Sequence, residues 1–327
     1  MKALVTGATG FIGSVLSREL ISLGHQVRAL VLPGEDTGVL EILGIEVIEG
    51  DLTNPESLRG ICDGVETVFH LAGRVTDWGK KELFYRAILD ATRYLLDEAA
   101  GRTERFVYIS SMAAIGLGRH MKGIRETDPA FKSGIPYNDA KLDAEKIVME
   151  YHDSGRISCT TIRPANVTGG GSVWVRDILD KMRSMPLPLI DGGRYSSSLI
   201  FVENLVDGII LGATRDNARG KTYHLRDDWD VTWKRYITDL GSFIGKRPVG
   251  SVPYPVANFL GRVCDAIFTP LNIRPPLTRM AVEITGRDND VDNTLAKRDL
   301  GWNTRISYQE ALQKIGVWVM DHYLKGA

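Results

Sequence analysis

The strongest constraint on the fold lies in the first stretch of the chain, where an apolar run meets three evenly spaced glycines. Residues 2–13 read KALVTGATGFIG, and an apolar pattern of helical period follows. We expect a strand, a turn and a helix from Phe11. Glycine allows a sharp turn at Gly7, close approach of a pyrophosphate at Gly10 and close helix packing at Gly13. Such glycines also occur in strand-to-helix turns for structural reasons alone, so the motif leaves both interpretations open.

Strands and helices alternate along the first half of the chain. A second strand, residues 25–32, follows the first helix directly, and longer helices are expected at residues 80–100 and 137–153. Further strands are expected at residues 45–49, 67–71, 105–109 and 158–163. This alternation predicts an α/β fold with a doubly wound Rossmann parallel sheet, whose ligands lie at the carboxyl ends of the strands.

The pattern changes beyond Pro164, where glycines, prolines and mixed segments replace the regular alternation. We therefore expect two domains. Residues 1–165 form an NAD(P)-binding Rossmann domain, and residues 166–327 form mainly a smaller C-terminal α/β substrate-binding lobe. Within the second part, residues of about 196–225, including a short apolar strand, are expected to return to the Rossmann sheet.

Charge and cysteine content exclude several classes of partner. Forty Lys and Arg against 41 Asp and Glu leave a formal net charge of −1, which gives no electrostatic basis for binding nucleic acid. The three cysteines (Cys62, Cys159 and Cys264) and six histidines are scattered without metal-binding spacing. Glycines interrupt the N-terminal apolar run, and no apolar run is long enough for a membrane span. We expect a cytoplasmic protein with a small-molecule substrate and no metal.

Tyr137 and Lys141 form a Tyr-x-x-x-Lys pair at the start of an expected helix. Side chains four residues apart project from one face of a helix. An ammonium near a phenol stabilises the phenolate and lowers its pKa, so Tyr137 becomes able to accept a proton from a substrate alcohol while a hydride leaves for a nicotinamide. In an isolated helix, two unrelated surface residues would be the more common explanation of this spacing.

Ser111 strengthens the catalytic interpretation of this pair. It ends the preceding strand of the same expected sheet, so its hydroxyl can hydrogen-bond the carbonyl or alkoxide oxygen of a substrate. A serine at a strand end can instead satisfy backbone groups, and we assign that structural role to Ser110.

Several motifs occur in an order typical of a known family. They are Gly7-x-x-Gly10-x-x-Gly13, Asp51-Leu52, His70-Leu71-Ala72-Gly73, Ser110-Ser111, Tyr137-x-x-x-Lys141, Arg163-Pro164 and Leu300-Gly301-Trp302. With this set the chain resembles, nearly end to end, the extended short-chain dehydrogenase/reductase superfamily of the NAD-dependent epimerase/dehydratase type.

The resemblance implies a Rossmann fold and a catalytic triad of Ser111, Tyr137 and Lys141. It implies that Asp51 and Leu52 contact the adenine, that Lys141 holds the nicotinamide ribose, and that residues 164–167 line the carboxamide. The cofactor-binding residues implied are Gly7, Thr9, Gly10, Phe11, Ile12, Gly13, Asp51, Leu52, Leu71, Ala72, Gly73, Tyr137, Lys141, Pro164, Ala165, Asn166 and Val167.

Within the superfamily, the run from Val75 to Gly79 looks like the branch of 3β-hydroxysteroid dehydrogenases, dihydroflavonol-reductase-like proteins and long-chain β-keto acid reductases. The sugar-nucleotide epimerases and dehydratases commonly carry an Arg-Asp pair where this chain has Ser197-Ser198, and that Arg binds a diphosphate. We therefore expect a weakly charged or uncharged apolar substrate, such as a steroid-like ring or a long-chain β-hydroxy or β-keto compound. A nucleotide-sugar epimerase or dehydratase using bound NAD is the alternative. A non-catalytic relative is a third hypothesis, disfavoured because both Tyr137 and Lys141 are present.

The preferred cofactor is NAD, and NADP stays open. An NADP site in this branch usually carries an Arg near the end of the second strand, where this chain has Val31-Leu32. Glu35 or Asp36 is then the candidate partner of the ribose. The family often has an Asn in the long helix where this chain reads Ile88 to Thr92, so details of the proton path differ here.

The apolar stretch from Val252 to Ile273 has three interpretations: ordinary core, a lid over an apolar pocket, or peripheral contact with a membrane surface. The resemblance also implies a homodimer, for which the helices expected at residues 80–100 and 137–153 are the candidate interface.

Overall fold

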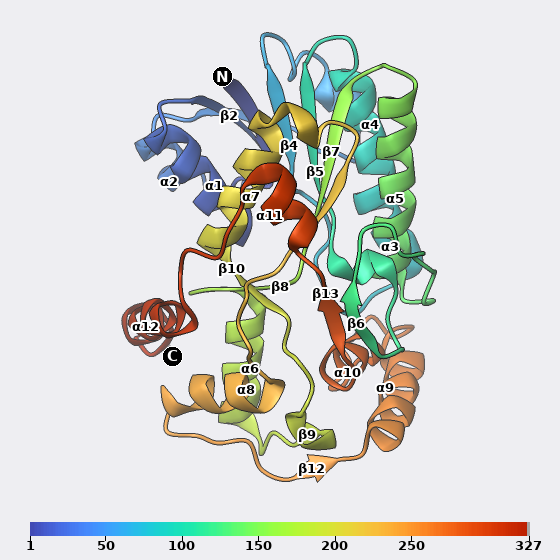
Figure 1. Cartoon of the computed structure of the whole chain (residues 1–327), viewed down its shortest axis with the longest axis vertical. Helices are drawn as coiled ribbons and strands as arrows, with labels where there is room; N and C mark the ends of the chain where they lie inside the picture. The colour runs from blue at the N-terminus through green and yellow to red at the C-terminus, as the bar shows by residue number, and fades with distance from the viewer. Residues whose placement is uncertain (326–327) are drawn as a thin grey trace.

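A seven-stranded sheet forms the centre of the molecule. The structure is a computed structural model that describes residues 1–325, and its main sheet has the strand order β11-β7-β5-β4-β1-β2-β3 (Figure 1). The strands are β1 (Lys2–Thr6), β2 (Gln26–Val31), β3 (Glu46–Glu49), β4 (Thr67–His70), β5 (Arg105–Ile109), β7 (Ser158–Pro164) and β11 (Thr222–Leu225). Neighbouring strands run parallel. The winding reverses between β1 and β4, so the switch point that favours ligand binding lies at their carboxyl ends.

Helices cover both faces of this sheet, because successive side chains of each strand point to opposite faces. In β1, Leu4 packs with Leu95 in one apolar cluster, whereas Val5 packs with Leu16 and Ile209 in the other. The first cluster lies under α3 (Lys81–Phe84), α4 (Ala91–Ala99) and α5 (Pro136–Asp153), and the second lies under α1 (Phe11–Ser22), α7 (Val202–Thr214) and α11 (Thr294–Leu300). The core therefore consists of two layers separated by the sheet.

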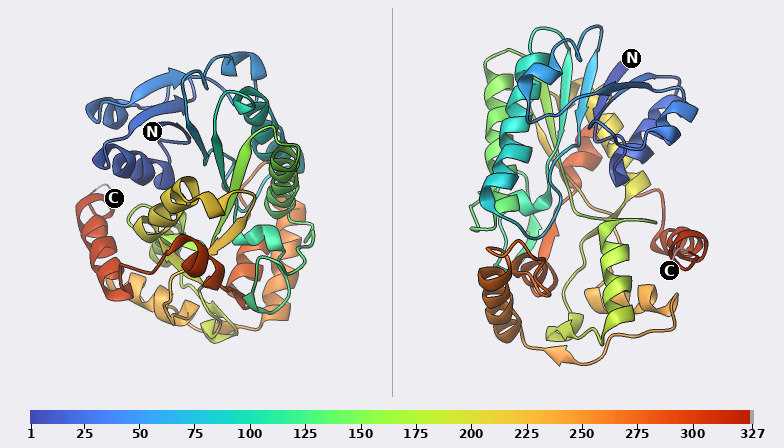
Figure 2. Two further views of the ribbon diagram at one scale, coloured as in Figure 1. Left: turned by 45° about the horizontal axis from the view of Figure 1, so that its top comes forward. Right: turned by 180° about the vertical axis from the view of Figure 1, so that it is seen from behind.

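Short parallel strand pairs and helices form a smaller layer at the carboxyl end of the sheet (Figures 1 and 2). The pairs join β8 (Asn166–Thr168) to β10 (Leu199–Phe201), β9 (Leu189–Ile190) to β12 (Ser251–Val252) and β6 (Met121–Ile124) to β13 (Asn289–Val291). The helices are α6 (Val173–Ser184), α8 (Trp233–Ser242), α9 (Tyr254–Phe268), α10 (Arg279–Thr285) and α12 (Tyr308–Trp318). This layer closes the end of the sheet at which the predicted site residues lie.

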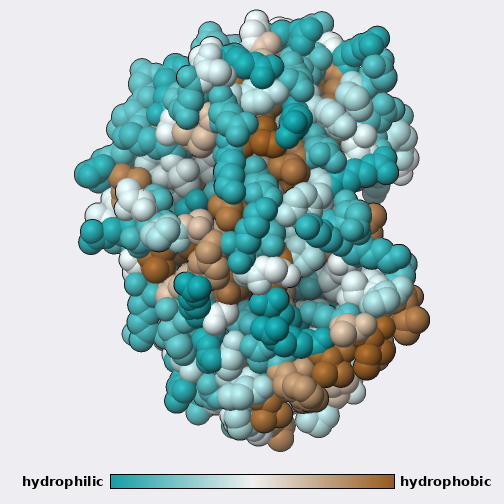
Figure 3. All heavy atoms as spheres, turned by 90° about the vertical axis from the view of Figure 1, so that its right-hand side faces the viewer, coloured by the Kyte–Doolittle hydropathy of each residue, from teal (hydrophilic) through white to brown (hydrophobic). Residues whose placement is uncertain are grey.

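One helix of this layer, α9, is apolar on two sides. Tyr254, Ala257 and Gly261 are its buried residues. Seven apolar side chains in the stretch that begins with this helix are exposed, namely Val256, Phe259, Leu260, Val263, Ile267, Leu271 and Ile273. Figure 3 shows apolar surface gathered on the lower part of the face that contains α9. Ordinary core packing therefore does not explain most of the apolar residues between Val252 and Ile273.

The predicted α/β fold with a doubly wound parallel sheet is confirmed. The long helix expected at residues 80–100 is interrupted by a π-helical turn (Tyr85–Asp90), and a short helix, α2 (Gly38–Ile42), follows the second strand without having been predicted. Of the segment expected to return to the sheet, β11 forms an edge of the main sheet, whereas β10 pairs with β8 outside it. The domain boundary at residue 165 stays a prediction.

Candidate active site

The glycine turn between β1 and α1 has the geometry of a phosphate-binding loop. Gly7 adopts φ +71°, and a Cβ at Gly13 would lie 2.0 Å from the Gly7 carbonyl oxygen, so no other residue fits there without moving the turn. Gly10 is the N-cap of α1 and contributes no side-chain hydrogen bond to the helix start. The first N–H groups of α1 are therefore not capped by that residue. This arrangement fits the pyrophosphate of a dinucleotide.

A carboxylate stands beside this turn. The hydroxyl of Thr9 donates to Glu35 Oε2 over 3.0 Å, and the backbone N–H of Leu32 lies 3.4 Å from the same oxygen. Asp36 instead accepts from Gly38 at the start of α2. Of the two candidate ribose partners, Glu35 is thus the one held at the glycine turn. A carboxylate suits a ribose diol and repels a 2′-phosphate.

A buried histidine, His70 at the carboxyl end of β4, contacts Thr6 at the carboxyl end of β1. His70 Nδ1 lies 2.8 Å from Thr6 Oγ1, and His70 Nε2 lies 3.0 Å from Thr92 Oγ1. Thr6 Oγ1 also accepts from the backbone N–H of Ala72 over 3.2 Å. Burial, with a smaller effect of the Lys141 charge, lowers the pKa of His70 to about 3, so this imidazole is neutral.

Thr92 was not predicted as a site residue. It ends the stretch in which the family's usual Asn is missing, and its hydroxyl also donates to the Ile88 carbonyl oxygen over 2.5 Å, across the π-helical turn. Thr92 therefore supplies a polar contact in this part of the site, where the family often has an Asn. No sequence pattern indicated this role, because a threonine within a helix usually hydrogen-bonds only its own helix.

Tyr137 and Lys141 both lie on the inward face of α5. Tyr137 is 7% exposed and Lys141 is 3% exposed. The Lys141 ammonium donates to the Ile109 carbonyl oxygen over 2.7 Å and lies 4.8 Å from the centre of the Tyr108 ring. It also lies 4.0 Å from the position that a Cβ at Gly73 would take. The structure therefore brings Lys141 to the ends of β4 and β5.

Two opposing effects act on the pKa of Tyr137. Burial raises the pKa of Tyr137, and a hydrogen bond with the Ser111 side chain acts in the opposite direction. Burial lowers the pKa of Lys141 to about 8, and the charge of Glu145 acts in the opposite direction. Desolvation of the phenolate therefore outweighs the effect of Ser111, and whether Lys141 lowers the phenol pKa stays a prediction.

The assignment of the two serines after β5 also needs correction. Ser111 Oγ accepts from the backbone N–H of Ala113 over 3.1 Å and caps the short 3₁₀ helix Met112–Ile115. Ser110 Oγ is buried and has no hydrogen-bond partner in the part of the chain that the structure describes. Ser111, not Ser110, therefore satisfies a backbone group.

The remaining predicted cofactor residues lie in loops at the same edge of the sheet. Asp51 Oδ1 accepts from the backbone N–H of Thr53 over 2.8 Å, and Leu52 packs against the core. Asn166 Nδ2 donates to the Ser197 carbonyl oxygen over 2.8 Å, so its side chain holds the β8–β10 connection. Whether these residues contact a cofactor stays a prediction.

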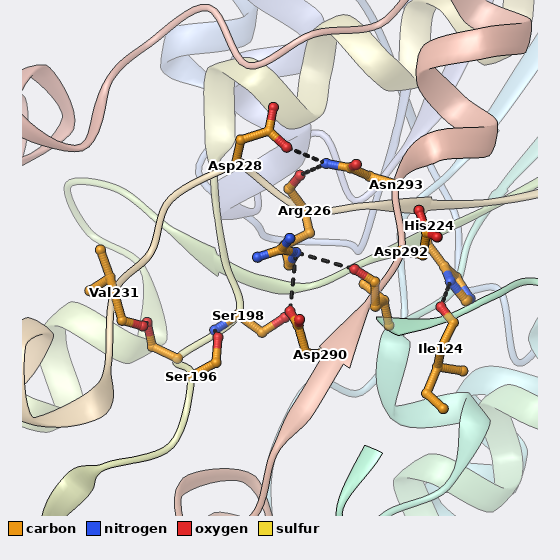
Figure 4. Close-up of polar contacts among 12 residues, drawn as sticks. Ile124, Ser196, Ser198, His224, Arg226, Asp228, Val231, Asp290, Asp292 and Asn293 are labelled. Atoms are coloured by element: carbon orange, nitrogen blue, oxygen red, sulfur yellow. Dashed lines mark hydrogen bonds and ion pairs between the residues drawn. The ribbon is translucent and has the colours of Figure 1, made fainter. Parts of the chain in front are cut away.

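The region around Ser197 and Ser198 contains an arginine that the sequence did not indicate. Arg226, directly after β11, donates to the Val291 carbonyl oxygen and forms an ion pair of 3.2 Å with Asp290 (Figure 4). Asn293 bridges the Arg226 carbonyl and Asp228. Because Asp290 neutralises this guanidinium, it is not a free replacement for the missing phosphate-binding arginine.

A cavity of about 350 Å³ opens beside Tyr137. Its lining is Thr76, Asp77, Trp78, Gly79, Phe84, Gly134, Ile135, Pro136, Tyr137, Arg262, Asp265, Ala266, Thr269, Arg279 and Met280. The run after Gly73, the start of α5, and helices α9 and α10 thus form its walls. The residues from α9 and α10 were not predicted as site residues, because more than 120 positions separate them from Tyr137 in the sequence.

Within residues 1–325, no group of three or more His, Cys, Asp or Glu side chains is placed to hold a metal ion. None of the described helices is long and apolar enough to cross a membrane.

Comparisons with known proteins bear on the family and the fold of this chain. A family model described as "NAD dependent epimerase/dehydratase family" matches residues 3–225. The chain is 29% identical over 321 residues to the 4-hydroxy-2-methyl-3-oxo-4-farnesyl-3,4-dihydroquinoline-1-oxide ketoreductase of Stigmatella aurantiaca, covering 96% of both proteins. It is 27% identical over 335 residues to a 3 beta-hydroxysteroid dehydrogenase/Delta 5-->4-isomerase of Mycobacterium tuberculosis, covering 95% of this chain and 88% of that protein. The structure matches UDP-glucose 4-epimerase of Thermotoga maritima with a TM-score of 0.79 at 21% identity, covering 99% and 100% of the two chains. That last likeness concerns the fold.

Proposed function

The chain belongs to the NAD dependent epimerase/dehydratase family, and from this premise we propose that it interconverts a secondary alcohol and a ketone on a largely apolar substrate. It is a dehydrogenase/reductase enzyme of the extended short-chain type, with NAD as its cofactor, in agreement with the sequence-based prediction. The observation that carries the proposal is that Tyr137, buried on the inward face of α5 four residues before the buried Lys141, bounds the cavity.

The roles of the side chains follow from their positions. The Ser111 hydroxyl can hold the reacting oxygen, and Tyr137 can take the proton of the alcohol or return it to the alkoxide. The positive charge of Lys141 favours the phenolate once a proton has left. When bound, the oxidised nicotinamide accepts the hydride that leaves the carbinol carbon.

The apolar part of the substrate would lie against Trp78, Phe84, Ile135 and Met280, which line the cavity beside Tyr137. The relatives named above as a ketoreductase and a 3 beta-hydroxysteroid dehydrogenase support a ketone or alcohol on a large apolar skeleton. A steroid-like ring and a long alkyl chain stay equally open.

The alternative is a nucleotide-sugar epimerase or dehydratase, in which the hydride returns to the same substrate. The similarity in fold to the Thermotoga maritima epimerase is compatible with this alternative. Against it, Ser197 and Ser198 replace the usual Arg-Asp pair, and Arg226 is paired with Asp290.

One assay separates the two functions. A panel of secondary alcohols, including 3β-hydroxysteroids and 3-hydroxy fatty acid esters, is incubated with NAD, and net NADH formation is followed. The proposal requires NADH with at least one alcohol, and Tyr137→Phe should lower that rate by about 10²- to 10⁴-fold because the proton acceptor is lost. An unchanged rate in Tyr137→Phe would argue for a non-catalytic or differently built site, and UDP-sugar conversion without net NADH would favour the epimerase.

We also propose a cytoplasmic homodimer in which α4 and α5 of two copies pair. These helices pack together on one face of the sheet (Figure 1), and the free thiols of Cys62 and Cys159 are buried, as suits a reducing compartment. Light scattering of the purified protein gives the molar mass directly, and a monomer at micromolar concentration would contradict the dimer.

A further inference from the structure

Four charged side chains line the cavity beside Tyr137, and two of them, Asp77 and Arg279, lie within ion-pair distance of a partner. Asp77 accepts from the Thr278 hydroxyl over 2.8 Å and pairs with Arg274 at 3.5 Å. Asp265 accepts from the backbone N–H of Arg279 over 3.0 Å. The Arg279 guanidinium donates to the Ser133 carbonyl oxygen over 2.8 Å and lies 3.7 Å from Glu283. Arg262 is an exposed residue at the rim of the cavity, and among residues 1–325 its guanidinium has no ion-pair partner.

A chain of hydrogen bonds orients Arg262. Arg262 Nε donates to Asn258 Oδ1 over 2.8 Å. The amide nitrogen of Asn258 in turn donates to Glu283 Oε1 over 3.0 Å, and Tyr254 donates to the other Glu283 oxygen over 2.6 Å. Glu283 is 1% exposed, so the carboxylate at the end of this network is held inside the protein. The Nε side of the guanidinium is thereby held, and its two terminal nitrogens stay available for another acceptor.

We propose that Arg262 binds a carboxylate of the substrate, so that the enzyme acts on hydroxy or keto acids with an apolar chain. The inference rests on the proposed function, because it concerns the second polar group of the alcohol or ketone that Tyr137 serves. A planar guanidinium with two free nitrogens matches a carboxylate in two parallel hydrogen bonds. The apolar side chains between Tyr137 and Arg262 would then take the alkyl part of the same molecule.

The two acidic side chains of the cavity, Asp77 and Asp265, do not strongly oppose the binding of a substrate carboxylate. The Asp77 carboxylate is partly neutralised by Arg274. Burial, with a further effect of the Asp77 charge, raises the pKa of Asp265, which shifts that carboxyl toward its neutral form. A single carboxylate is therefore the anion that this balance of charges accommodates, whereas a diphosphate would carry more charge than one arginine neutralises.

A binding experiment tests the proposal without relying on turnover. Calorimetry on the NAD-loaded protein compares octanoate with octanamide, which have nearly the same shape and differ in charge. We expect Arg262→Gln to weaken octanoate about 10-fold and octanamide by less than about 2-fold, with Arg262→Lys between wild type and Arg262→Gln for octanoate. Arg247→Gln, which removes an exposed arginine outside the cavity lining, is the matched control and should change neither affinity. Higher salt should reduce the preference for octanoate in the wild type.

Turnover provides an independent second readout. Wild type should oxidise 3-hydroxyoctanoate with a higher kcat/KM than its methyl ester, and Arg262→Gln should lose that preference through KM while Tyr137→Phe lowers kcat on both. Equal effects of Arg262→Gln on octanoate and octanamide, or no binding of octanoate by the wild type, would overturn the role of Arg262. Absence of NADH formation with every alcohol, alongside charge-selective binding that depends on Arg262, would instead overturn the proposed function alone.

Discussion

At the scale of the residue, Gly13 has the least room for a side chain of the three glycines in the turn between β1 and α1. An added Cβ would lie 2.0 Å from the Gly7 carbonyl oxygen and 2.7 Å from the Gly7 carbonyl carbon. We predict that Gly13→Ala displaces the turn, destabilises the protein by about 1–3 kcal/mol and weakens NAD binding at least about 10-fold. Thermal unfolding with and without NAD measures both effects, since a bound ligand raises Tm.

The matched control for this variant is Gly38→Ala at the start of α2. Its nearest neighbour would be Asp36 Oδ1 at 3.4 Å, which is an ordinary contact. Gly38→Ala should leave the NAD-dependent rise in Tm unchanged. A normal rise in Gly13→Ala would show that the turn tolerates a side chain and that its role in phosphate binding is misassigned.

His70 makes the stability of the protein depend on pH. Its pKa is about 3 in the folded protein, mainly through burial, against about 6.5 in an unfolded chain. The folded state therefore binds this proton more weakly, so the contribution is fully present above about pH 6.5 and is lost as the pH falls toward 3. The slope should reach about 1.4 kcal/mol per pH unit for one histidine.

Urea unfolding at several pH values between 7 and 5 checks this prediction. His224 is buried as well, with a pKa of about 3. As the pH falls, the free energy of unfolding of the wild type should therefore decrease with a slope that corresponds to the uptake of roughly two protons on unfolding, one for each histidine. In His70→Gln the slope of unfolding free energy against pH should be smaller by the amount that one proton contributes, about 1.4 kcal/mol per pH unit, whatever the absolute stability of the variant. Identical slopes in both proteins would mean that folding does not lower the pKa of His70.

At the scale of the element, a buried ion pair joins α5 to β7. Arg163 donates from Nε and Nη2 to the two oxygens of Glu145 over 2.9 and 2.7 Å, and its third nitrogen lies 3.2 Å from His224 Nε2 on β11. Both charged residues are buried. Glu145→Gln leaves the guanidinium without its counter-charge, so we predict a loss of about 3–5 kcal/mol in the free energy of unfolding.

Lys146→Gln on the same helix is the control for this prediction. Lys146 is exposed and pairs with Asp143 at 3.2 Å, and such surface pairs contribute less than about 1 kcal/mol. Urea unfolding of the two variants measures the difference. Similar losses in both would mean that water reaches the Arg163–Glu145 pair and screens it.

The elements also explain how far the sequence could predict this site. The glycine turn and the Tyr137–Lys141 spacing were predictable, because a turn and a helix face are fixed by residues a few positions apart. The contacts of Arg262 and Asp265 with the cavity depend on where α9 packs, which no local pattern determines. Likewise, the pKa of Tyr137 depends on burial by the whole fold, and the sequence-based reasoning considered only its charged neighbour.

At the scale of the whole molecule, the cavity and the apolar surface meet at α9. One side of this helix lines the cavity with Arg262, Asp265 and Ala266, and Phe259 and Ile267 of the same helix are exposed. An apolar substrate dissolves in a bilayer far better than in water, so an enzyme that meets the membrane at the wall of its cavity shortens the path of the substrate. We predict that this apolar surface binds the interface of a phospholipid bilayer.

Co-sedimentation with liposomes of phosphatidylcholine and phosphatidylglycerol, without detergent, tests this prediction. Phe259→Asp places a charge in the apolar surface and should reduce the bound fraction several-fold, because a charge opposes insertion between lipid headgroups and acyl chains. Ile42→Asp is the control, since Ile42 on α2 is 87% exposed at a site away from α9. If the wild type does not bind the liposomes, the prediction that this surface contacts a membrane is wrong. If Phe259→Asp instead halves the molar mass measured by light scattering, a second copy of the chain covers this surface.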